Sequence, residues 1–153
     1  MPESPFDHLD DLLTRIHVAR QRPSWRRRLL DGAGPVTNGS TLRTLRAVDH
    51  HQPNGGGAAS GDVADYLAVE HSTASRTVSA VVAAGLLAKS SADDDQRRSV
   101  LVLTDNGVQA LATVTDRRRD LVAETVADWD TAHIDRLVIL LGRAAERFEG
   151  AAG

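Results

Sequence analysis

A run of opposite charges at residues 93–98, DDDQRR, has the most distinctive chemistry in this sequence. In it three consecutive acids, Asp93 to Asp95, are followed after one residue by Arg97 and Arg98, so unlike charges stand side by side. The flanking segments LLAKS and SVLVL are short and typical of strands. The run is therefore predicted to form the tip of a β-hairpin. The simpler alternative is an exposed turn whose salt bridges contribute little.

A second polar group opens a predicted helix, with Ser72, Thr73, Ser75 and Arg76 in the segment STASRTVSAVVAAG. Apolar residues of this segment recur at helical spacing, and Gly85 is a natural C-terminal cap. A short helix from Ser60 precedes it. Two short helices joined tightly and followed by a hairpin indicate a winged helix-turn-helix. The alternative for the hydroxyl residues is ordinary helix capping, for example by Ser72.

Further helices are predicted on both sides of this region. Phe6, Leu9, Leu13 and Ile16 indicate an amphipathic first helix, which Pro23 should kink or split. Residues 31–40 form a cluster of turn residues, and 52–61 a glycine-rich loop.

The helix between these two loops is expected to begin at an N-cap, Ser40, and Thr104 should cap the helix after the hairpin. The last helix carries a wide apolar stripe. Its members are Ile134, Leu137, Leu141, Ala144 and Phe148.

Composition narrows the class of protein. The chain has 153 residues, 25% of them charged, a net charge of −3 and no cysteine, which fits one globular domain without disulfides. The acidic N-terminus lacks the features of a signal peptide, and no apolar run reaches the ~18 residues of a membrane span, so a cytoplasmic protein that does not enter membranes is expected. No nucleophile, phosphate-loop or His-Glu metal motif is present, so neither an enzyme nor a cofactor is expected.

Adjacent histidines on a helix point about 100° apart, so His50 and His51 are expected to be solvated rather than to share a metal ion.

The stretch from residue 63 to 107 resembles the MarR family of transcriptional regulators. The similarity rests on the helix-turn-helix, Gly85-Leu86 after the second helix, Asp95-Gln96-Arg97 at the hairpin tip, and Leu103-Thr104 with Gly107. The flanking helices also fit in position and length. The resemblance implies a mainly α fold with a small β-hairpin wing, a single MarR-like domain over 1–153. Within it, 36–104 would form the winged helix-turn-helix lobe, and 1–33 and 105–153 the dimerisation helices.

The resemblance also assigns roles to the polar residues. Arg97 would enter the minor groove of DNA, oriented by Asp95, while Arg98 reaches phosphate or solvent. Arg76 would contact a base in the major groove, and hydroxyl groups would position the helix on phosphates. The predicted DNA-binding residues are Ser72, Thr73, Ser75, Arg76, Ser79, Asp95, Arg97 and Arg98.

The expected function is a homodimeric regulator that binds a double-stranded operator, a repressor released by a small amphipathic or aromatic ligand. The ligand would contact Trp25, Leu42, Leu45, His51 and the helix after Thr104. One feature favours a different function. Between residues 60 and 104 there are four basic and six acidic residues, and this balance favours a winged-helix module that binds a protein partner and no operator.

Overall fold

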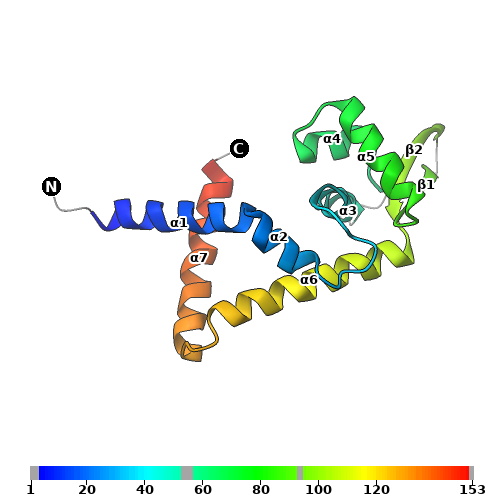
Figure 1. Cartoon of the computed structure of the whole chain (residues 1–153). Coiled ribbons are helices and arrows are strands. Elements are labelled where there is room, and N and C mark those ends of the chain that lie inside the picture. The colour runs from blue at the N-terminus through cyan, green and yellow to red at the C-terminus, as the bar shows by residue number, and fades with distance from the viewer. Residues whose placement is uncertain (1–3, 53–56, 93–94, 152–153) are drawn as a thin grey trace. The chain divides into compact units, whose positions relative to one another are not determined.

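The computed structural model describes residues 4–52, 57–92 and 95–151, and of residues 92 and 95–98 it describes the backbone only. The described chain contains seven helices and a two-stranded antiparallel sheet, which confirms the predicted mainly α fold with a hairpin wing (Figure 1). It divides into two compact units, one up to Arg117 and the other from Arg118 onward. No helix in the described ranges is both long and apolar enough to span a membrane.

The first unit begins with α1 (Pro5–Gln21) and α2 (Pro23–Leu30). Pro23 splits the helix as predicted, because the backbone at Arg22 turns extended, with φ −64° and ψ 143°. Helix α3 (Gly39–His51) begins earlier than predicted. Its N-cap is Asn38, whose side chain accepts a hydrogen bond from Thr41 N at 2.8 Å, so the prediction of Ser40 as the cap is wrong.

Helices α4 (Ser60–Leu67) and α5 (His71–Ala83) form the helix-turn-helix (Figure 1). The turn between them is three residues long and contains Ala68 in the left-handed conformation, with φ 53°. Gly85 follows the C-cap of α5, Ala84, and closes this end of the helix as predicted, with a φ of 78° that suits glycine. The amides of Gly85 and Leu86 then bond back to the carbonyls of Val82 and Val81.

The hairpin consists of β1 (Leu87–Ala92) and β2 (Asp95–Leu103). Its register pairs Leu87 with Leu103 and continues to Ser91 with Ser99, after which an irregularity shifts the pairing to Ala92 with Asp95. Ala58 pairs with Leu101 through two backbone hydrogen bonds of 3.0 and 2.7 Å, so the chain leading into α4 is joined to the hairpin.

The core of this unit lies between α3, α4, α5, the hairpin and the first half of α6 (Asp105–Thr125). Fully buried members come from all of these elements: Leu45, Val63, Val81, Leu87, Leu101 and Val114. Thr44 is also buried, and its hydroxyl donates to Ser40 O at 2.8 Å, which removes the cost of burying it.

The predicted cap of α6 is confirmed. Thr104 Oγ1 accepts a hydrogen bond from Gly107 N at 3.0 Å and donates one to Gly85 O at 2.7 Å. A side chain at Gly107 would collide with the Leu86 carbonyl, so glycine allows α6 to start directly against the end of α5.

The second unit contains the end of α6 and the whole of α7 (Thr131–Ala151). Helix α7 has no buried residue, and Leu137, Leu141 and Phe148 of the predicted stripe are exposed. In the first unit α1 likewise has no buried residue, and Phe6 is 79% exposed.

Candidate nucleic-acid interface

One face of α5 is polar and open to solvent. Ala74, Val78 and Val81 are buried against the lobe, as predicted, and helical spacing places the polar residues on the opposite side. The structure therefore brings together on one exposed surface five predicted site residues: Ser72, Thr73, Ser75, Arg76 and Ser79.

The charge on this face is available for a ligand. Arg76 is exposed, and within the described ranges it forms no hydrogen bond or ion pair. Ser72 is not the helix cap, because Glu70 occupies the N-cap position. The capping interpretation of Ser72 is therefore wrong, and the hydroxyl is left exposed on the surface.

The wing contributes the second group of predicted residues. Asp95 begins β2 and pairs with Ala92, and Arg97 and Arg98 follow on the same strand. The side chains of these three residues lie outside the described part of the chain, as does the whole of Asp93 and Asp94. Their roles at the DNA stay predictions.

The acidic balance of the lobe is partly explained by local structure. Asp62 is a first-turn residue of α4, and its carboxylate accepts a hydrogen bond from Ala59 N at 2.8 Å. This carboxylate therefore stabilises the start of α4 and is not part of the exposed polar face of α5, which is called the recognition face below. Glu70 is different, since it is exposed at the start of α5 and its side chain caps nothing.

Sequence reasoning did not single out His71, the first residue of α5. Its side chain is exposed. A Cβ built on Gly61 would lie 3.2 Å from its Cε1 atom, so the ring rests on the backbone at the start of α4. Neither spacing nor composition signals this contact, which depends on how the turn folds α5 back on α4.

The residues predicted to bind a ligand fall into two groups. Leu42 and Leu45 are buried core residues of α3. Trp25 and His51 are half-buried, and His51 Nδ1 lies 2.8 Å from Ala47 O. None of the four lines any of three surface hollows of about 320, 480 and 690 Å³, and their contact with a ligand stays a prediction.

His50 and His51 do form a small aromatic cluster with Tyr66 of α4. Their ring centroids lie 5.2 Å apart with an interplanar angle of 82°, and the His50 ring lies 5.3 Å from the Tyr66 ring. Among the described residues, no three histidine, cysteine or acidic side chains come together as a metal site would require.

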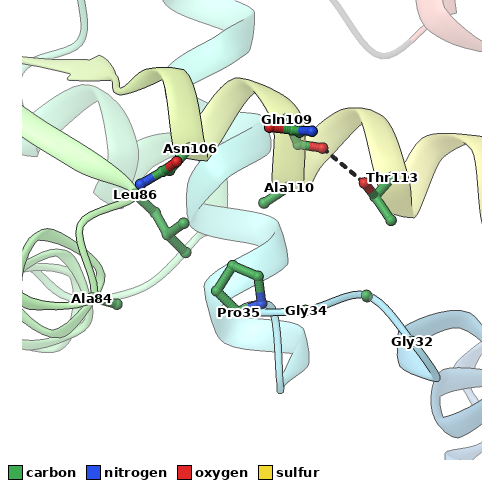
Figure 2. Close-up of a pocket in the computed structure, with 10 residues that line it drawn as sticks. Gly32, Gly34, Pro35, Ala84, Leu86, Asn106, Gln109, Ala110 and Thr113 are labelled. Atoms are coloured by element: carbon green, nitrogen blue, oxygen red, sulfur yellow. Dashed lines mark hydrogen bonds between the residues drawn. The ribbon is translucent and has the colours of Figure 1, made fainter.

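A hollow of about 320 Å³ lies where the loop after α2, the end of α5 and the first turns of α6 meet. Figure 2 shows Leu86, Ala110 and Pro35 around it. The polar residues in its wall, Asn106, Gln109 and Thr113, are uncharged, and the Thr113 hydroxyl donates to Gln109 O at 3.0 Å. A larger open groove of about 690 Å³ between α2 and the start of α3 is lined by Arg26, Arg27 and Arg28.

A helix-turn-helix with a polar outer face, followed by a hairpin and flanked by long helices, defines a winged helix-turn-helix fold. A family model described as MarR family matches residues 37–98, which include α3, α4, α5, β1 and the start of β2. No curated protein sequence matches the chain.

Solved structures extend the match to nearly the whole chain. A MarR family transcriptional regulator from Silicibacter pomeroyi DSS is 30% identical, with a TM-score of 0.62, over 95% of this chain and 94% of that one. A MarR family protein from Bacillus stearothermophilus is 19% identical, with a TM-score of 0.76, over 97% and 99%. MepR of S. aureus, solved in complex with DNA, is 17% identical, with a TM-score of 0.62, over 88% and 95%. The chain belongs to the MarR family.

Proposed function

We propose that the protein is a sequence-specific transcriptional repressor that acts in the cytoplasm as a homodimer and releases its operator when a small molecule binds. The observation that carries the proposal is the exposed face of α5, which presents Arg76 and four hydroxyl side chains beside the wing. A guanidinium that pairs with none of the described residues, with hydroxyls beside it, suits base edges and phosphates in a major groove. The fold is also that of MepR, which was solved bound to DNA.

The direct test is to isolate genomic DNA that the protein binds at physiological salt and to measure the affinity for the fragments recovered. We expect one site in the protein's own upstream region to be enriched. If the protein recovers no specific DNA, the alternative of a protein-interaction module, which the four basic and six acidic residues at 60–104 favour, replaces this proposal.

Arg76 allows a sharper test on the operator. If it contacts a base, Arg76→Ala should flatten the preference at one base position and cost about 1–3 kcal/mol on the preferred sequence. If it contacts only phosphate, the same variant should weaken binding to all sequences alike. A series of single-base substitutions, measured with wild type and variant, distinguishes the two.

Of the three hollows on the first unit, the ligand is expected to bind either in the uncharged hollow of about 320 Å³ or in the arginine-lined groove of about 690 Å³. The uncharged hollow of Figure 2 adjoins the end of α5 and the first turns of α6, the helix in which ligand contacts were predicted. A ligand there would press on the element that carries the recognition face. The arginine-lined groove between α2 and α3 instead suits an anionic ligand.

A panel of phenolic acids and uncharged aromatic amides should raise the melting temperature and weaken operator binding. Ala110→Phe would fill the uncharged hollow and Arg26→Ala would remove a cation from the groove, so each variant localises the response to one hollow. A panel that changes neither the melting temperature nor the DNA affinity argues against ligand release.

A further inference from the structure

His71 occupies the edge of the recognition face rather than its centre. Along α5, helical spacing places Ser72, Arg76 and Ser79 in the middle of the exposed side, whereas His71 lies toward the flank that meets α4. Residue 61 of α4 is glycine, and a Cβ built there would lie 3.2 Å from Cε1 and 3.8 Å from Nε2 of the imidazole, so this edge of the ring lies close to the α4 backbone. An exposed group at the flank of such a helix is placed for the DNA backbone rather than for a base edge.

Among the described residues, no neighbouring charged group pairs with His71. Helix α5 packs against α4, α3 and β1, and its own charged residues near this end are Glu70 and Arg76. The titratable or charged groups of the packed elements are Asp62, Asp65 and Tyr66 on α4, Arg43, Arg46, Asp49, His50 and His51 on α3, and Lys89 on β1. In the part of the chain that the structure describes, none of them forms a hydrogen bond or ion pair with His71.

Glu70 makes the charge of His71 important. It is exposed at the N-cap position of α5, and if α5 binds DNA as proposed, its carboxylate would repel a phosphate at this end of the helix. A protonated imidazole one residue later supplies the opposite charge at the same place. A neutral imidazole does not.

We propose that His71 is a DNA-backbone contact whose strength depends on its protonation, so that operator affinity rises as the pH falls from about 8 to about 6. The inference rests on the proposed DNA-binding function. The sign follows from the chemistry, because the protonated form carries the charge that attracts phosphate and is lost as the pH rises.

The test measures operator affinity at about pH 6 and pH 8 over a range of salt concentrations. Wild type should bind about fivefold to tenfold more tightly at the lower pH, with a salt slope steeper by about 0.9, as one added phosphate contact predicts. His71→Gln should lose both differences, and His71→Lys, with a permanent charge, should bind tightly at both pH values. His133→Gln in α7 is the matched control and should behave as wild type.

Two results would overturn the inference, and they have different meanings. If wild type and His71→Gln bind the operator with the same pH dependence, His71 is not the titrating contact, although operator binding and the proposed function stand. If wild type binds no operator specifically at either pH, the proposed function fails and this inference fails with it. Melting curves of each variant at both pH values establish that the lobe is folded.

Discussion

At the scale of single residues, the wing pair gives the most direct prediction. Arg97 stands two residues after Asp95 on β2, and its guanidinium is expected to enter the minor groove. Arg97→Ala should therefore weaken specific operator binding by about 1–3 kcal/mol, measured by fluorescence anisotropy, and Asp95→Ala should weaken it less. Arg143→Ala removes an arginine from α7 and serves as the control. Equal affinity for wild type and Arg97→Ala would show that the wing makes no such contact.

The residues differ in how far their roles could be predicted. Ala74, Val78 and Val81 were placed correctly because burial of one helix face leaves a period in the sequence. Leu42 and Leu45 were predicted to contact a ligand, and the structure places both in the core. The sequence does not separate these two roles, because an apolar side chain suits a pocket wall and a core equally well. His71 gave no signal, because its position depends on Gly61, ten residues earlier, meeting it across the turn.

At the scale of elements, the start of α3 shows the limit of cap prediction. Asn38 and Ser40 are both good N-cap residues, and the sequence does not say which backbone is extended. The structure shows φ −148° at Asn38 and its side chain bonded to Thr41 N. Asn38→Ala should lower the free energy of unfolding by about 1 kcal/mol in denaturant titration, while Ser40→Ala stays within about 0.5 kcal/mol. A larger loss for Ser40→Ala than for Asn38→Ala would mean that Ser40 is the N-cap of α3.

Two helical glycines make a second element-scale test, because their surroundings are opposite. A methyl group at Gly107 would collide with the Leu86 carbonyl, so Gly107→Ala must move the start of α6 away from the end of α5. We expect a loss of about 1–3 kcal/mol in unfolding free energy. Gly142 in α7 has no atom within 4 Å of an added Cβ, and Gly142→Ala should stabilise the protein by about 0.5–1 kcal/mol. A neutral Gly107→Ala would contradict the close joint between α5 and α6.

At the scale of the whole molecule, we expect the exposed apolar side chains of α1 and α7 to pack against a second copy of the chain. Neither helix has a buried residue, yet Phe6 is 79% exposed, Phe148 66% and Val138 64%. Single exposed apolar residues are ordinary, but continuous stripes along two helices are typical of an interface. A second copy of the chain, related by a two-fold axis, would cover both stripes and supply a second recognition helix. The operator would then be a pseudo-palindrome with half-sites about one helical turn apart.

This architecture is tested by placing a charge in the stripe. Leu137→Glu should separate the subunits in sedimentation experiments at micromolar concentration, because a carboxylate buried between two copies has no partner. Arg136→Glu introduces the same side chain about 100° around the helix from Leu137 and should leave the dimer intact. Operator affinity should fall with the dimer, since one lobe keeps only one recognition helix and one wing. Wild-type protein that sediments as a monomer, or a monomeric variant that binds the full operator as tightly as wild type, would contradict a dimeric regulator.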